Sequence, residues 1–81
     1  MGMLRVLSRR GDDHTTWDVR LAVLGDAEAQ AAIAEAERVF QEQRARGATA
    51  FTIEQGRAPV RVDTFNPQAE QIVMVPRVVG G

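Results

Sequence analysis

The spacing of apolar and polar residues predicts a hairpin at the start of the chain. Residues 3–8 form a short apolar run, and residues 15–23 alternate between apolar and polar side chains with a period of two. Both patterns are typical of β-strands, and the second indicates a half-buried strand. The polar residues 9–13 between them, with Gly11 at their centre, predict a turn. Trp17 is in phase with the apolar positions of the second strand, so we expect it to pack against the sheet.

Residues 27–46 show a different pattern, which predicts one long amphipathic helix. They are rich in Ala, Glu, Gln and Arg, all strong helix formers. Asp26 is expected to cap the helix, because its carboxylate can accept a free backbone N–H of the first turn, and Glu28 suits the positive end of the helix dipole. Gly47 is expected just beyond the helix, in the left-handed region. Six apolar residues recur at helical spacing and predict the buried face: Ala29, Ala32, Ile33, Ala36, Val39 and Phe40.

The second half of the chain returns to strand patterns. Residues 49–53 and 60–64 each alternate, and residues 55–59 between them predict a turn. Residues 65–67 (Phe-Asn-Pro) are expected to end the second of these strands. Residues 71–75 form a continuous apolar run, typical of a central strand that is covered on both faces. The order strand, strand, helix, strand, strand, strand predicts an α+β fold with one amphipathic helix across a mixed sheet.

Composition excludes several classes of function. The 81 residues suffice for one small domain, and the net charge is −1, with eleven acidic residues against ten arginines and no lysine. This balance argues against a nucleic-acid binder that relies on a basic surface. The chain has no cysteine, which excludes thiolate chemistry. Its one histidine is His14, so there are too few histidines for a histidine-based zinc site or for a Ser-His-Asp triad with a second histidine in reserve. We interpret Asp12, Asp13 and His14 as solvated turn residues.

We expect a cytoplasmic protein without a membrane partner. No apolar run approaches the ~20 residues of a membrane span, and the first residues lack the apolar core of a signal peptide. The sequence also shows no motif for a catalytic acid–base pair, a metal cluster or a phosphate-binding loop. The sequence therefore predicts no enzyme in its own right.

The last ten residues, Ile-Val-Met-Val-Pro-Arg-Val-Val-Gly-Gly, carry a resemblance to a known family. They resemble the closing strand and tail of the small subunit of molybdopterin synthase, which usually ends in Pro-Pro-Val, one residue and Gly-Gly. Arg77 stands where that family has its second proline, and residues 67–70 lack the Asp-Gly-Asp turn of the family. The positions that match the family's ending are Pro76, Val78, Gly80 and Gly81.

The resemblance extends loosely over the whole chain through the order of its elements. The thiamine sulfur carrier and ubiquitin share this order and the terminal diglycine. The resemblance therefore implies the ubiquitin-like β-grasp superfamily: a mixed sheet in the order ββαβββ with one helix packed across it. It also implies a β-grasp domain over residues 1–76 and a flexible diglycine tail over residues 77–81.

In this superfamily the reactive group is the C-terminal carboxylate, here that of Gly81. The resemblance implies that an E1-like enzyme adenylates it with ATP, and that sulfur or an enzyme cysteine then attacks to give a thiocarboxylate or a thioester. The protein itself would bind no cofactor. Gly80 and Gly81 lack a Cβ and can thread a narrow channel, while Val78 and Val79 favour an extended tail that docks by strand-like pairing. Pro76 and Arg77 would form the root of that docking segment.

Two questions stay open in the sequence. The tail fits a sulfur carrier, which would act with a synthase large subunit, and equally a covalent modifier of target lysines. The absence of lysine excludes lysine-linked chains of the protein itself, and it is also what a GC-rich genome would produce. A different class, a non-covalent interaction or assembly module without C-terminal chemistry, is the alternative. In the first class, Arg61, Met74 and Arg77 are expected to flank the tail and help a partner to grip it.

Overall fold

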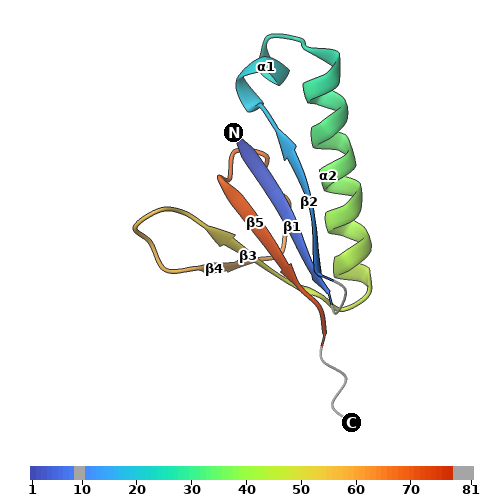
Figure 1. Ribbon diagram of the computed structural model, residues 1–81, viewed down its shortest axis with the longest axis vertical. Helices are drawn as coiled ribbons and strands as arrows, with labels where there is room; N and C mark the ends of the chain where they lie inside the picture. Colours follow the sequence, from blue (N-terminus) through green and yellow to red (C-terminus); the bar gives the residue numbers. More distant parts are fainter. Residues whose placement is uncertain (9–10, 78–81) are drawn as a thin grey trace.

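Five strands form one mixed sheet, and one long helix lies along a face of it (Figure 1). The computed structural model describes residues 1–8 and 11–77, except for the side chain of Asp12. The sheet has the order β2-β1-β5-β3-β4, with β1 parallel to β5 and every other neighbouring pair antiparallel. Its elements are β1 (Gly2–Ser8), β2 (Gly11–Trp17), α1 (Val19–Val23), α2 (Ala27–Ala45), β3 (Thr49–Ile53), β4 (Val60–Val62) and β5 (Gln71–Val75).

The N-terminal hairpin is confirmed, but its second strand starts and ends earlier than predicted. β2 already begins at Gly11, so the predicted turn over residues 9–13 is too long, and residues 9–10 lie outside the described part. The predicted strand over residues 15–23 is wrong beyond Trp17. Asp18 Oδ1 accepts hydrogen bonds from the backbone N–H groups of Arg20 (2.9 Å) and Leu21 (3.2 Å) and caps the short helix α1. A local side-chain cap thus outweighs the alternating pattern.

The long helix α2 is confirmed almost residue for residue. Asp26 caps it, with Oδ2 accepting from the backbone N–H of Ala29 at 2.9 Å. The helix ends at Ala45 rather than at residue 46, and Gly47 follows with a φ of +91°. Within the described residues, neither helix is long and apolar enough to cross a membrane. The predicted apolar face is confirmed, with Ala29, Ala36 and Phe40 buried and Ala32, Ile33 and Val39 half-buried.

β5 is the central strand, as predicted, but α2 covers only one of its faces. Ile72 and Met74 point into the core, where their cross-strand partners are Leu4 and Ala50. The alternate side chain of Val73 lies on the other face and is half-buried. The expectation that both faces are covered is therefore wrong, because a two-layer fold leaves one sheet face without a second layer. The strand predicted over residues 60–64 also ends sooner, at the end of β4.

The connection between β4 and β5, residues 63–70, closes one end of the core. The ring of Phe65 lies 5.6 Å from that of Trp17 and 5.8 Å from that of Phe40, measured between ring centroids. Trp17 is buried, as predicted, and its indole Nε1 donates to the carbonyl oxygen of Pro67 at 2.9 Å. A Cβ placed on Gly2 would overlap the indole ring of Trp17, its cross-strand partner. The core is thus built around a tryptophan that joins the hairpin to this connection.

Candidate functional site

The predicted tail leaves the sheet from its central strand. β5 runs between β1 and β3, and the chain continues through Pro76 and Arg77, both exposed, at the end of the molecule away from α1 (Figure 1). The remaining residues of the predicted docking segment, Val78, Val79, Gly80 and Gly81, lie outside the described part of the chain. The site that the structure describes is therefore the root of the tail and the surface around it.

Arg77 packs its aliphatic stem across Gly47. A Cβ built on Gly47 would lie 3.1 Å from Cδ and 3.6 Å from Cβ of Arg77. Glycine is favoured at position 47 because its φ of +91° is rarely adopted by residues with a side chain, and a Cβ there would also require the Arg77 side chain to shift slightly. The root of the tail is thereby in contact with the turn that ends α2.

Arg44, in the last turn of α2, stabilises the turn that ends the helix. Its guanidinium donates from Nη1 to the carbonyl oxygen of Ala48 at 2.9 Å and from Nη2 to Oδ1 of Asp63 at 3.1 Å. These two bonds join the last turn of α2 to the start of β3 and to the segment after β4. A cation in the last helical turn also suits the negative end of the helix dipole. The surface beneath Arg77 is consequently fixed by contacts from three parts of the chain.

The other two residues expected to grip the tail do not lie beside it. Met74 is 0% exposed and belongs to the core, so that expectation is wrong. The alternation along β5 turns its side chain toward α2, and a partner has no access to it. Arg61 is exposed but lies on β4, opposite Phe51 of β3, so a whole strand separates it from β5. Of the three residues, Arg77 alone lies at the tail.

The clearest perturbation of ionisation lies on the outer face of α2. Arg38 donates to Glu35 at 2.6 Å and to Glu42 at 2.8 Å, one turn away on either side. The hydrogen bond from Arg38 lowers the pKa of Glu35, and the two carboxylates raise the pKa of Arg38. All three side chains are about half exposed, so water screens the interaction. This is a surface ion-pair network that supports the helix.

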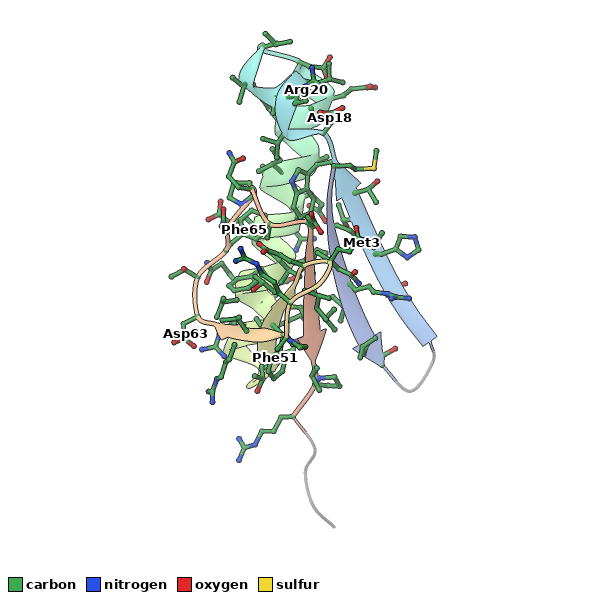
Figure 2. All side chains as sticks on the ribbon, turned by 90° about the vertical axis from the view of Figure 1, so that its left-hand side faces the viewer. Met3, Asp18, Arg20, Phe51, Asp63 and Phe65 are labelled. Carbon is green, nitrogen blue, oxygen red and sulfur yellow. The ribbon has the colours of Figure 1, made fainter. Side chains whose placement is uncertain are left out.

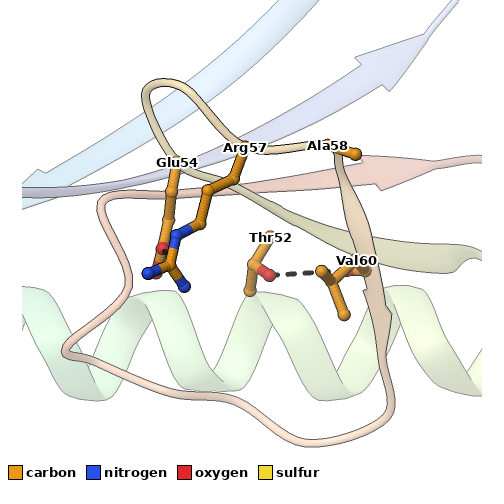
Figure 3. A pocket seen from close by; sticks show the side chains of 5 residues that line it. All are labelled: Thr52, Glu54, Arg57, Ala58 and Val60. Carbon is orange, nitrogen blue, oxygen red and sulfur yellow. Dashed lines mark hydrogen bonds and ion pairs between the residues drawn. The ribbon is translucent and has the colours of Figure 1, made fainter.

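Two further parts of the surface were considered as binding sites, one for a metal ion and one for a small ligand. Asp13 and His14 are exposed on β2, and the described residues contain no cluster of three or more His, Asp or Glu side chains that could hold a metal ion. A hollow of about 150 Å³ lies against the β3–β4 connection (Figure 3). In it, Arg57 Nη1 lies 3.8 Å from Glu54 Oε2, and Thr52 Oγ1 donates to the carbonyl oxygen of Val60 at 3.4 Å. Its polar groups are thus already partnered.

Comparison of the chain with protein-family models, with curated protein sequences and with solved structures found no match in any of the three.

Proposed function

We propose that this protein is a ubiquitin-like β-grasp carrier or modifier that reacts through the C-terminal carboxylate of Gly81. The observation that carries the proposal is the diglycine that follows the end of the central strand β5 by four residues, in the sequence Pro76-Arg-Val-Val-Gly-Gly. Support also comes from the fold, because a mixed five-stranded sheet with one long helix on one face is compatible with a β-grasp domain.

The proposed chemistry has two steps, both catalysed by partners. A carboxylate oxygen of Gly81 attacks the α-phosphate of ATP on an E1-like enzyme, which forms an acyl adenylate and releases pyrophosphate. A sulfur nucleophile then attacks the acyl carbon and AMP leaves, giving a thiocarboxylate or a thioester. Glycine suits this position because no Cβ blocks the approach to the carbonyl. The partner that accepts the product is a synthase large subunit in sulfur transfer or a target lysine in conjugation.

In this proposal the folded domain serves as the part that a partner holds. The root of the tail, at Pro76 and Arg77, is exposed, while the contact of Arg77 with Gly47 ties it to the end of α2. A fixed root lowers the conformational freedom that the tail loses when it enters an enzyme channel. In this proposal the described residues position the tail, while the reacting atoms belong to the tail and to the partner enzyme.

The deciding experiment is mass spectrometry on the protein and its adducts from the native host. A free protein in which one carboxylate oxygen is replaced by sulfur identifies a sulfur carrier. Trypsin cleaves after Arg77, so a modifier would leave a Val-Val-Gly-Gly remnant on target lysines. A C-terminal carboxylate that is never modified, in the presence of the host's activating enzymes, would contradict the proposal.

A non-covalent interaction module is the second candidate, and one observation favours it. The apolar side chains of Val23 and Leu24, at the end of α1, are largely exposed, and α1 lies at the end of the molecule opposite Pro76 and Arg77 (Figure 1). Adding residues after Gly81 separates the two functions. The extension abolishes adenylation, measured as ATP-dependent release of pyrophosphate with the activating enzyme, but leaves non-covalent binding unchanged.

A further inference from the structure

In the part of the chain that the structure describes, the sheet face opposite α2 carries apolar side chains without a second layer over them. Alternation along the paired strands places six of them there, all half-buried except Leu7, which is 37% exposed. These six residues, called the open-face patch, are Met3, Leu7, Phe51, Ile53, Val73 and Val75. Figure 2 looks onto this face, with Met3 and Phe51 labelled and α2 behind the sheet. Among the described residues, the core and the side chains packed against it include none of the six, so they form a separate apolar surface of the kind that a partner covers.

Two arginines border the open-face patch, one on each side. Along one row across the sheet, Arg5 on β1 is the partner of Val73 on β5, and Val73 is the partner of Phe51 on β3. Phe51 lies in turn opposite Arg61 on β4, and both arginine side chains are exposed. None of the described residues that share this face on these four strands is acidic, although the whole chain has a net charge of −1. The patch therefore fits an apolar partner surface that carries acidic residues on both of its sides.

The spacing of the two arginines selects the kind of partner. Neighbouring strands lie about 4.8 Å apart, and β1 and β4 are separated by three strand spacings, so the backbones of Arg5 and Arg61 are roughly 14 Å apart. An α-helix with its side chains is about 10–12 Å across and fits between them, whereas a single extended peptide is too narrow to reach both. A second copy of the chain would bring its own two arginines onto the same surface, where the like charges repel. The geometry and the charge thus favour a helix with acidic residues.

We propose that the open-face patch binds an amphipathic α-helix of a partner protein, with an apolar stripe that is flanked on both sides by acidic residues. The stripe lies on Val73 and Phe51, and the acidic side chains pair with Arg5 and Arg61. A single helix covers less than the roughly 800 Å² per partner of a standard stable interface, so the complex is weak, with a dissociation constant on the order of 100 μM. The proposal does not depend on any chemistry at Gly81.

A designed helical peptide tests the proposal on the full chain. Its apolar stripe consists of Leu and Ile, its flanking positions are all Glu, and it carries a fluorescent label; in a second peptide, Lys replaces every flanking Glu. We expect anisotropy titrations to give a dissociation constant of about 100 μM for the Glu-flanked peptide and one at least about tenfold weaker for the Lys-flanked peptide. In the NMR spectrum of isotope-labelled protein, the amide signals of Phe51 and Val73 should shift, while that of Arg38, on the outer face of α2, should not.

Charge reversal tests the role of the arginines. Arg61→Glu should weaken binding of the Glu-flanked peptide at least about fivefold and strengthen binding of the Lys-flanked peptide, because it exchanges an attractive contact for a repulsive one. Arg20→Glu is the matched control, since Arg20 is also exposed but lies on α1, away from the sheet face (Figure 2). It carries the same change of net charge and should alter either affinity by less than about twofold. A far-ultraviolet circular dichroism spectrum checks that each variant is folded.

Removal of an aromatic ring tests the apolar stripe. Phe51→Ala should weaken binding of the Glu-flanked peptide about tenfold. Val60→Ala is the matched control, because Val60 is an exposed apolar residue whose cross-strand partner, Thr52, lies on the core face of the sheet. Equal affinity for the two peptides, or equal effects of Arg61→Glu and Arg20→Glu, would overturn the proposal. A dimer of the chain alone that shifts the amide signals of the open-face patch would show that a second copy covers it, and would overturn the proposed helix as well.

Discussion

The two connections on either side of β4 are similar in polar composition but differ in what they contribute to the core. Residues 54–59 (Glu-Gln-Gly-Arg-Ala-Pro) and residues 63–70 (Asp-Thr-Phe-Asn-Pro-Gln-Ala-Glu) are both short, polar and contain one proline. Every residue of the first connection is exposed. The second connection places Phe65 against two core aromatic rings and buries Ala69. One aromatic side chain thus converts a connection into part of the core.

The hydrogen bonds of the two connections differ in the same way. In residues 63–70, the carbonyl oxygens of Pro67 and Glu70 accept from Trp17 Nε1 and from the backbone N–H of Met3, at 2.9 and 3.1 Å. Both donors belong to the N-terminal hairpin, far away along the chain. In residues 54–59, the backbone N–H of Arg57 bonds to the carbonyl oxygen of Glu54, only three residues away. The backbone N–H of Gln55 also donates to Glu70 Oε2 at 3.3 Å, but this bond is exposed and does not reach the core. We therefore expect substitutions in the second connection to lower global stability and those in the first to have small effects.

Phe65→Ala should have the largest effect. It removes a half-buried ring that contacts both Trp17 and Phe40, and we expect a loss of about 2–4 kcal/mol in the free energy of unfolding, somewhat less than for a fully buried phenylalanine. Urea denaturation followed by circular dichroism measures it. Val60→Ala, at an exposed apolar position of β4, is the control and should cost under ~1 kcal/mol. Equal losses for the two variants would show that Phe65 stabilises the fold no more than an exposed valine does, and would contradict its assignment to the core.

Trp17→Phe should come next. The ring is largely kept, but the donor to the carbonyl oxygen of Pro67 is lost and that oxygen is left without its partner, at a cost of about 1–3 kcal/mol. Native-state hydrogen exchange gives the specific readout. The backbone N–H of Ala69, bonded to the carbonyl oxygen of Asn66 at 3.1 Å, should lose protection. If that amide keeps its protection while stability falls, the tryptophan acts through packing alone and does not hold the connection.

Sequence reasoning succeeded where the determining interactions are local. The start, apolar face and end of α2 all follow from residues within a few positions of one another, such as Asp26 and Gly47. It failed over residues 19–23, where alternating apolar residues predicted strand and the cap at Asp18 produces a helix. Asp18 was itself the available signal, since aspartate commonly precedes a helix. Phe65 was assigned only to a strand end, because its partners Trp17 and Phe40 are distant in sequence and no local pattern reports them.

The candidate site likewise combines features that the sequence shows with contacts that only the fold creates. The diglycine, together with Pro76 and Arg77, is visible in the sequence as a motif. The contact between Arg77 and Gly47 is not, because it depends on how the end of α2 and the end of β5 meet in space. Met74 was wrongly assigned to the surface near the tail, because nearness along the chain does not say which face of a strand a side chain occupies.

Gly56→Ala tests the exposed connection at its most constrained residue. Gly56 has a φ of +78°, and a Cβ at this position would have no atom within 4 Å, so the cost is backbone strain alone. We expect a loss of about 1 kcal/mol, or a fall of about 4–8 °C in the melting temperature. Gly56→Asn should lose less, because asparagine tolerates the left-handed region better than alanine does. A larger loss for Asn than for Ala would show that this residue is limited by space.

Arg57→Ala should have the smallest effect of the series. Its guanidinium lies 3.8 Å from the carboxylate of Glu54, and 78% of the arginine side chain is exposed, so solvent screens the pair. We expect a change below about 0.5 kcal/mol, which 1 M salt should remove almost completely. A double-mutant cycle with Glu54→Gln isolates the pair from other contacts of either side chain. A coupling above ~1 kcal/mol would show that an ion pair stabilises the exposed connection. The two connections would then differ in the type of interaction that stabilises them, and not in how strongly they are stabilised.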